Sequence, residues 1–302
     1  MNGQNGGPDS VAAKMKVAAV EIEGALDNLL PRSDGPEGRL YEAMRYAVLV
    51  PAKRLRPILV LAGADLFNVS RNSALRVAAA VELVHTYSLL HDDLPCMDDD
   101  AMRRGQPATH LKFDEATAVL AGDALLPLAF QVLADPDTHA DAGVRAELCL
   151  DLAQAVGGHG MVGGQAIDLA MQQGSANIGT ITRAQQLKTG ALIAFSAESG
   201  AILAQAAPQL RHALHAFSHD LGLAFQIVDD LLDAEGEEAA MGKGVRKDAA
   251  AGKATFVSLL GADRARTQAG ILASQAVEHL EPFAANGEFL RSLAQFVVQR
   301  NR

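Results

Sequence analysis

The chain has 302 residues, with 26 Lys plus Arg against 36 Asp plus Glu, so its formal net charge is −10. This acidic balance excludes a bulk nucleic-acid binder, because such proteins present an excess of basic side chains to phosphates. With 49% hydrophobic and 21% charged residues, the composition is that of an ordinary globular protein and excludes overall disorder. Cys96 and Cys149 are the only cysteines, which excludes a four-cysteine zinc site and favours a reducing compartment.

The N-terminal segment and the longest uncharged stretch bear on cellular location. Residues 1–10 read MNGQNGGPDS and lack a positive region followed by an apolar one, so we expect a disordered start and no signal peptide. The longest stretch without Asp, Glu, Lys or Arg covers 152–167, only 16 residues with five glycines. It is too short to cross a bilayer as a helix. We therefore expect a cytoplasmic protein without an integral membrane segment.

Apolar residues recur mostly at helical spacing, and the alternating pattern typical of strands is hard to find. We expect an all-α protein, with helices over roughly 11–30, 37–49, 57–67, 73–92, 113–133, 142–156, 162–172, 183–205, 209–233, 255–260, 263–280 and 287–299. Prolines and glycines separate these segments at 31–36, 51, 105–107, 174–179 and 236–252, and none of the breaks resembles a long flexible linker. The pattern favours one helical bundle domain over 11–302.

An acidic cluster occupies 91–100, with the sequence His-Asp-Asp-Leu-Pro-Cys-Met-Asp-Asp-Asp. A solvated acidic turn is the ordinary interpretation of such a run. This one directly follows the apolar helix predicted over 73–92, where acidic side chains oppose the helix macrodipole unless a cation compensates them. That unfavourable position favours a functional role.

A second cluster has a geometry that its spacing predicts. Gln226, Asp229, Asp230 and Asp233 stand at i, i+3, i+4 and i+7, so they share one helix face and their carboxylates should converge. Oxygen ligands with no His or Cys at metal-binding spacing fit Mg²⁺, which commonly bridges carboxylates to substrate phosphates. Two such clusters in one helical chain favour a magnesium site that faces a diphosphate.

Basic residues complete this pattern. Lys53-Arg54-Leu55-Arg56-Pro57 precedes a predicted helix, with the proline suited to its first turn, and a helix N-terminus itself favours anions. Further cations follow the two acidic clusters or begin another helix: Arg103, Arg104, Lys188, Lys243 and Lys253. His85 lies two helical turns before the first cluster on the same face, and its spacing alone favours an ordinary core histidine.

Together these motifs resemble the class I trans-prenyltransferases, the polyprenyl diphosphate synthase family. The resemblance covers about 40–302 and rests on Lys53-Arg54-Leu55-Arg56-Pro57, Asp92-Asp93-x4-Asp98 with Arg103-Arg104-Gly105, Gly164-Gln165, Lys188-Thr189-Gly190, Phe225-Gln226-x2-Asp229-Asp230-x2-Asp233 and Gly252-Lys253. It implies long antiparallel helices around a deep central cavity, with the aspartate motifs facing each other across its mouth, and usually a homodimer.

The resemblance also implies roles for single residues. Mg²⁺, with three ions per site, would be held by Asp92, Asp98 and Asp229, with Asp93 and Asp233 in support. The allylic diphosphate would bind Arg103, Lys188, Lys243 and Lys253, and isopentenyl diphosphate would bind Lys53, Arg56, His85 and Arg104. Lys188 would assist ionisation to an allylic cation, and the side-chain oxygens of Thr189 and Gln226 would stabilise that cation.

Product length in the family depends on the depth of the cavity below the first aspartate motif. Tyr87 and Ser88 precede Asp92 by five and four residues, about one turn deeper along the helix. A large aromatic there acts as a floor in the family, and the two-residue insertion containing Pro95 resembles short-chain bacterial enzymes. We therefore expect the C15 product farnesyl diphosphate, with C20 geranylgeranyl diphosphate as the alternative. A plain core aromatic is the less favoured interpretation of Tyr87.

Other classes explain the sequence less well. A helical phosphohydrolase could use the His91-Asp92 pair with other histidines, but it leaves the second aspartate cluster unexplained. A terpene cyclase should carry more cavity aromatics than the 4% found here, with no Trp. A non-catalytic partner subunit usually lacks one aspartate motif, and both motifs are intact here.

The sequence departs from the family pattern at two places. Pro51-Ala52 stands where the family commonly has glycines, and the proline offers no backbone N–H to a phosphate, so the affinity for isopentenyl diphosphate could differ. Val257 stands in place of a proline.

Overall fold

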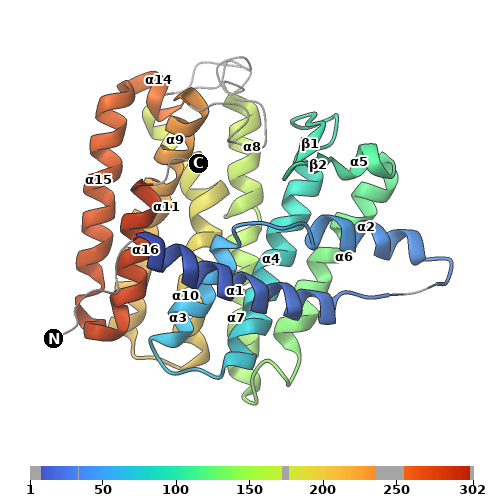
Figure 1. The fold of residues 1–302 in the computed structure, drawn as a ribbon, viewed down its shortest axis with the longest axis horizontal. Helices are drawn as coiled ribbons and strands as arrows, with labels where there is room; N and C mark the ends of the chain where they lie inside the picture. Colours follow the sequence, from blue (N-terminus) through green and yellow to red (C-terminus); the bar gives the residue numbers. More distant parts are fainter. Residues whose placement is uncertain (1–7, 33, 172–176, 236–254, 300–302) are drawn as a thin grey trace.

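A computed structural model describes residues 8–32, 34–171, 177–235 and 255–299 (Figure 1). It confirms the predicted helical bundle. The helices are α1 (Pro8–Leu29), α2 (Gly38–Val48), α3 (Leu55–Asp65), α4 (Arg71–Asp92), α5 (Thr109–Lys112), α6 (Glu115–Ala134), α7 (Ala142–Val156), α8 (Met161–Met171), α9 (Ile178–Gln185), α10 (Ala191–Leu203), α11 (Pro208–Glu235), α14 (Phe256–Leu260), α15 (Ala262–His279) and α16 (Glu288–Gln299).

Several segments differ from the prediction. Helix α1 begins at Pro8, inside the stretch 1–10 that was expected to be disordered, and the short helix α5 was not expected. The helix expected over 183–205 is divided into α9, a π-helical turn η1 (Gln186–Gly190) and α10, and α9 begins five residues earlier than expected. The stretch before α16, in which the prediction placed no separate element, holds a 3₁₀ helix η2 (Glu281–Gly287). The spacing of apolar residues does not distinguish a π-helical or 3₁₀ turn from an α-helix. Such turns continue the helical path with small changes in hydrogen bonding.

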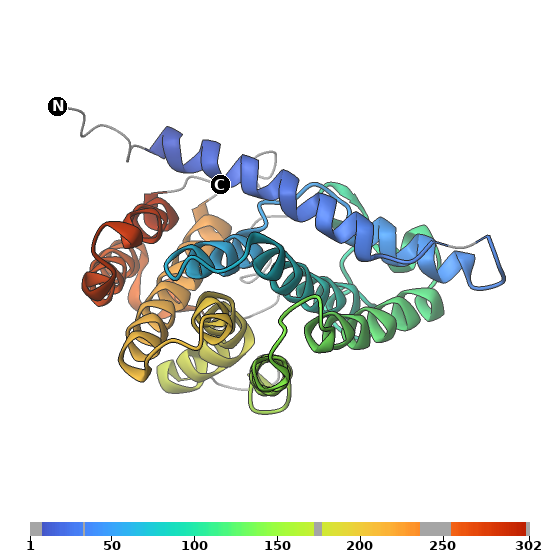
Figure 2. The same cartoon turned by 90° about the horizontal axis from the view of Figure 1, so that it is seen from below.

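Helix α4 lies at the centre of the bundle. Residues 77–84 are at most 1% exposed, so this helix is buried on every side, and it packs against α1, α3, α6 and α10. Its alanines let neighbouring helices approach closely. Seen along the bundle, α1 runs across one side of the other helices (Figure 2). A smaller second core joins α9, α11, α14 and α15.

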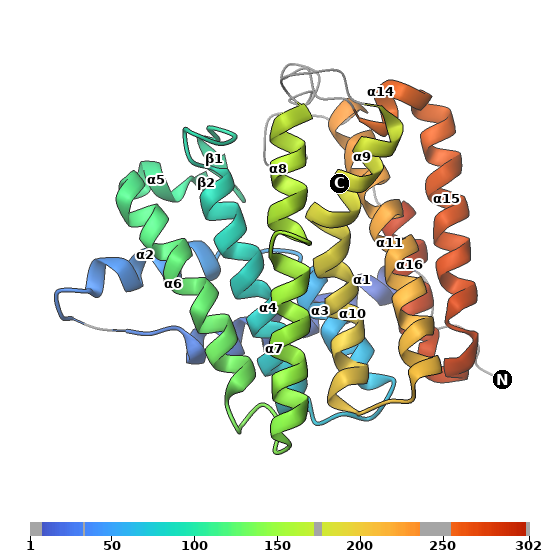
Figure 3. The ribbon, with the colours of Figure 1, turned by 180° about the vertical axis from the view of Figure 1, so that it is seen from behind.

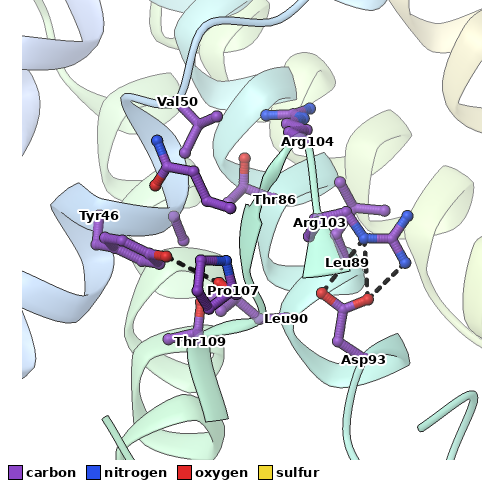
Figure 4. A pocket seen from close by; sticks show the side chains of 12 residues that line it. Tyr46, Val50, Thr86, Leu89, Leu90, Asp93, Arg103, Arg104, Pro107 and Thr109 are labelled. Atoms are coloured by element: carbon purple, nitrogen blue, oxygen red, sulfur yellow. Dashed lines mark hydrogen bonds and ion pairs between the residues drawn. The ribbon is translucent and has the colours of Figure 1, made fainter. Parts of the chain in front are cut away.

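A two-stranded antiparallel hairpin, β1 (Met102–Arg103) and β2 (Gln106–Pro107), was not predicted because strands of two residues carry no periodic signal. Its turn is formed by Arg104 and Gly105, which have φ of 52° and 77°. The Tyr46 hydroxyl donates a 2.8 Å hydrogen bond to the Pro107 carbonyl and so ties the hairpin to α2 (Figure 4).

Of the helices that the structure describes, α6 alone is long and apolar enough to cross a bilayer by length and composition. One such helix is weak support for a membrane span, because core helices of globular proteins meet the same criteria. Helix α6 packs along the central helix α4 and against α2 and α7, as a core helix does.

Candidate active site

The two aspartate clusters lie at the same end of the bundle. Helix α4 ends beside the hairpin, and α11 ends beside α14 at the same end of the bundle (Figures 1 and 3). Two cavities open there. An apolar cavity of about 520 Å³ lies between α4, α6, α8 and η1, and a more polar one of about 320 Å³ lies between α4, the hairpin and α11. Both are lined by Arg56, His85, Leu89 and Thr189, so the cavities adjoin each other.

The first cluster folds back on the end of α4. The Asp98 amide donates a 2.9 Å hydrogen bond to the Asp92 carbonyl, and the Asp100 amide donates one of 3.2 Å to the Asp93 carbonyl. These bonds hold Asp98 beside Asp92. Burial raises the pKa of the Asp92 carboxyl to about 6; the neighbouring Asp98 and Asp93 add to the increase, whereas Lys188 and Arg103 oppose it. A carboxylate in this setting gains from a bound cation.

Asp93 faces the protein interior rather than the apolar cavity. It is 3% exposed, and the Arg103 guanidinium donates from Nε to its Oδ1 at 2.9 Å (Figure 4). Arg103 also donates to Asp100 at 3.0 Å. The two carboxylates therefore fix Arg103 on the wall of the polar cavity, which is where the sequence placed a diphosphate ligand. A role of Asp93 at the metal stays a prediction.

In the second cluster the prediction that all carboxylates converge is wrong for Asp230. Asp229 lines the polar cavity. Asp230 is 5% exposed, and it accepts hydrogen bonds from the Gln226 amide at 3.0 Å and from the Phe256 backbone amide at 3.2 Å. These two bonds hold the Asp230 carboxylate against α14 and its own helix, and it does not line the polar cavity. Asp230 instead joins α11 to α14, and Asp233 is 8% exposed.

Lys188 and Thr189 lie on the π-helical turn η1. The Lys188 ammonium donates a 2.7 Å hydrogen bond to Asp168 on α8, and both Lys188 and Thr189 line the apolar cavity. Although burial lowers it, the pKa of Lys188 is raised overall by Asp168, Asp92 and Asp98. The Thr189 hydroxyl donates to Gln226 Oε1 at 3.1 Å. The three residues predicted to be catalytic therefore come together where the two cavities adjoin.

Asp168 holds the Lys188 ammonium in place, but no sequence motif identified it. It is one carboxylate in an apolar helix, three residues after Gln165. The signal that could have found it is burial: an ionised side chain facing a protein interior needs a partner of opposite charge. Gln165 itself lines the apolar cavity, and neither polar atom of its amide has a partner among the described residues.

The predicted isopentenyl diphosphate ligands divide into two groups. Arg56, His85 and Arg104 line the polar cavity, and Arg56 Nη1 donates to His85 Nε2 at 3.3 Å. Burial, with Arg56 and Arg104 nearby, lowers the pKa of His85 well below its usual 6.5. Lys53 is exposed and lines neither cavity. Lys243 and Lys253 lie outside the described residues.

These residues fit a magnesium-dependent site. Among the described residues, no three His, Cys, Asp or Glu side chains come close enough to hold an ion alone. Asp92 and Asp229 offer carboxylate oxygens to the two cavities, and Mg²⁺ binds such oxygens together with those of water and substrate phosphates. Within the same described part of the chain, Arg56 Nε and Arg104 Nη1 are buried without a protein hydrogen-bond acceptor. Such N–H groups suit phosphate oxygens.

The apolar cavity continues along α4 below Asp92. Tyr87, which is 7% exposed, and Ser88 line it together with Val119, Met161 and Val162 from α6 and α8. The His91 ring stands edge-on to Tyr87 with 5.8 Å between ring centroids, and its Nε2 donates to the Val119 carbonyl at 3.1 Å. This pair joins α4 to α6 at the cavity wall.

Comparison with known proteins identifies the family. Residues 37–283 match the polyprenyl synthetase family. The chain is 43% identical over 268 residues to farnesyl diphosphate synthase of Escherichia coli, covering 86% of this chain and 89% of that protein. It is 38% identical over 281 residues to geranylgeranyl diphosphate synthase of Cyanophora paradoxa, covering 93% of each.

Solved structures agree. The apo structure of an FPP/GFPP synthase from Zymomonas mobilis is similar with a TM-score of 0.88 and 48% identity, covering 97% of this chain and 100% of that one. A Helicobacter pylori geranyltransferase complexed with magnesium and isoprenyl diphosphate is similar with a TM-score of 0.82 and 32% identity, covering 95% and 96%.

The helical fold and the two aspartate clusters at one end of the bundle therefore define a trans-prenyltransferase. The chain belongs to the polyprenyl synthetase family, and it is a polyprenyl diphosphate synthase whose substrates are prenyl diphosphates. The family uses Mg²⁺, and the predicted isoprenoid synthase fold is confirmed.

Proposed function

We propose that the chain condenses isopentenyl diphosphate with dimethylallyl and geranyl diphosphate and releases the C15 product farnesyl diphosphate. The observation that carries this proposal is the position of Tyr87, a buried aromatic on the wall of the apolar cavity one turn below Asp92. A chain that grows into this cavity from the aspartates meets the Tyr87 and His91 rings. Farnesyl diphosphate synthases among the relatives support the same product length.

In the proposed reaction the allylic diphosphate binds between Asp92, Asp98 and Asp229, with Arg103 and Lys188 facing its oxygens. Asp92, Asp98 and Asp229, with Asp93 and Asp233 in support, would hold magnesium, with three ions per site, and the bound ions would supply positive charge that offsets the charge of the departing diphosphate. Lys188, held by Asp168, adds a fixed positive charge at the same place. Because Asp98 is partly exposed and hydrogen-bonded to Asp92 through its backbone, both carboxylates are within reach of ions at the cavity mouth.

Condensation follows ionisation of the allylic C–O bond. The side-chain oxygens of Thr189 and Gln226, which lie 3.1 Å apart, face the carbon chain and stabilise the allylic cation through their dipoles. Arg56, His85 and Arg104, with Lys53 at the surface, orient isopentenyl diphosphate so that its double bond attacks that cation. The apolar walls exclude water, which would otherwise capture the cation. The released diphosphate takes up the proton that is lost.

The floor assignment is tested by product length. Tyr87→Ala removes the ring and should shift the main product beyond C15, whereas Tyr87→Phe keeps the ring and should still give C15. The alcohols obtained after dephosphorylation are sized for both variants with geranyl diphosphate as primer. An unchanged product from Tyr87→Ala would place the floor elsewhere.

Geranylgeranyl diphosphate is the second candidate product. The Cyanophora paradoxa relative named as a geranylgeranyl diphosphate synthase is nearly as similar as the bacterial farnesyl diphosphate synthase. Ser88 is small, and Met161 on the opposite wall is flexible, so these residues could leave room for five more carbons. Predominant C20 from the unmodified chain would favour this candidate.

We also propose that the protein is a cytoplasmic homodimer. Exposed apolar side chains on the neighbouring helices α6 and α7 support a protein contact there: Leu120 and Leu150. Light scattering on the purified protein should give twice the 31.7 kDa chain mass, and Leu120→Glu should shift it toward the monomer. A monomeric unmodified chain would contradict the proposal.

A further inference from the structure

Glu82 is a buried charge that the aspartate motifs do not account for. It lies on α4 within the stretch 77–84, and it is 1% exposed among Val81, Leu83 and alanines. An ionised carboxylate in such surroundings is strongly unfavourable unless cations and hydrogen bonds compensate it. The residues that compensate this charge therefore indicate what Glu82 does.

Two arginines donate to the same oxygen of Glu82. Arg104 Nη2 lies 3.1 Å from Oε1, and Arg54 Nη1 donates to that oxygen as well. Arg54 is 2% exposed and also donates to the carbonyls of Val48 and Val50, at 2.7 and 2.9 Å. Arg54 therefore fixes the backbone before α3 and lines neither cavity. Arg104 differs, because it lines the polar cavity.

Arg104 is the second of two consecutive arginines on the hairpin, and the two diverge (Figure 4). Arg103 turns to Asp93, whereas Arg104, with a left-handed φ of 52°, turns to Glu82. One nitrogen of Arg104 is bound by Glu82, and Nη1 is buried with no acceptor among the described residues. Burial lowers the pKa of Arg56, and the like charge of Arg104 adds to the decrease, whereas the opposite charges of Glu82 and Asp229 oppose it.

We propose that Glu82 is a positioning residue for isopentenyl diphosphate: it holds Arg104 against the polar cavity and offsets the repulsion between Arg104 and Arg56. The inference rests on the proposed role of Arg104 as a ligand of that diphosphate. Because Glu82 touches neither Lys188 nor the aspartate clusters in the contacts described above, binding of the allylic diphosphate does not depend on it.

The test is steady-state kinetics of Glu82→Gln with Mg²⁺, isopentenyl diphosphate and geranyl diphosphate. The KM for isopentenyl diphosphate should rise about tenfold or more, as expected for loss of a charge-assisted hydrogen bond, and the KM for geranyl diphosphate should stay within about twofold. Leu133→Ala, in the core at the far end of α6, is the control for lost stability and should change neither KM. Equal increases in both KM values, or none, would overturn the inference.

A double variant shows whether Glu82 acts through Arg104. Arg104→Met should raise the KM for isopentenyl diphosphate, and adding Glu82→Gln should raise it little further. Should Glu82→Gln fail to fold, Glu82→Asp, which keeps the buried charge but shortens its reach, is measured in its place with the same expectation. A normal Glu82 variant beside an impaired Arg104→Met overturns only the positioning role. A normal Arg104→Met overturns both that role and the proposed ligand.

Discussion

Lys188 and Asp168 form a 2.7 Å ion pair between the turn η1 and helix α8, and the lysine of that pair faces the first aspartate cluster. The side chains are 28% and 20% exposed, so the pair is only partly shielded from water. The pair gives the lysine a fixed position before any substrate binds. Pre-organised charges of this kind contribute to catalysis because they need not reorganise during the reaction.

We expect the ion pair between Lys188 and Asp168 to stabilise the fold only when both side chains are present. Asp168→Ala leaves a partly buried ammonium without its nearest carboxylate and should lower the free energy of unfolding by about 1–2 kcal/mol. Lys188→Met in the same chain should recover part of that loss. Urea unfolding of both single variants and the double variant measures the coupling, and strictly additive losses would show that the pair has no energetic role.

Gly164 is predicted to be irreplaceable for a geometric reason. A Cβ at this position of α8 would lie 2.2 Å from the Lys188 backbone nitrogen, and backbone atoms cannot move aside as side chains do. Gly164→Ala should therefore push η1 away, lower the free energy of unfolding by about 1–3 kcal/mol and reduce turnover. In Gly24→Ala the new methyl meets no atom within 4 Å, so this control on α1 should stabilise by about 0.5–1 kcal/mol. Equal effects of the two variants would contradict the packing argument.

Asp229 and Asp230 are neighbours with different expected roles. Asp229→Asn removes a charge from the polar cavity and should lower kcat by roughly a hundredfold or more, with little change in stability. Asp230→Asn disturbs the bonds to Gln226 and the Phe256 amide and should lower the free energy of unfolding by about 2 kcal/mol. Paired kinetic and unfolding measurements separate the two, and the reverse pattern would reassign the metal ligand.

His85 should make stability depend on pH. Its pKa is lowered in the folded protein by burial and by Arg56 and Arg104, so below pH 6.5 the unfolded chain takes up a proton that the folded protein does not. Stability contributed by His85 is therefore lost as pH falls below that value, at up to about 1.4 kcal/mol per pH unit. His85→Gln should flatten the fall in unfolding free energy between about pH 7 and pH 5. Parallel curves for variant and unmodified protein would contradict this.

Local sequence predicted most of the fold. Helix α7 has the predicted bounds, because apolar spacing continues over the whole segment and glycine follows it. The turn η1 was missed, since a π-helical turn differs from an α-helix only in its hydrogen bonds. The hairpin was missed for a different reason: strands of two residues are too short to show an alternating pattern.

Site residues were predictable where a spacing defined them. Asp92, Asp98 and Asp229 belong to motifs, and the structure places them at one end of the bundle. Asp168 and Glu82 are single carboxylates whose partners come from other elements, so no local pattern identifies them. Asp230 is the opposite case, a residue that belongs to a motif but does not line the site. Helical spacing groups it with Asp229, but its contact with α14 turns it to the interior.

The most direct test of the account is condensation by the purified, unmodified chain. The protein is incubated with labelled isopentenyl diphosphate and, separately, dimethylallyl, geranyl and farnesyl diphosphates, with Mg²⁺ or with a chelator, and the dephosphorylated alcohols are sized. The account predicts a labelled C15 product from dimethylallyl and geranyl diphosphate with Mg²⁺, and none with the chelator. No condensation with any primer would contradict it and favour a non-catalytic partner subunit.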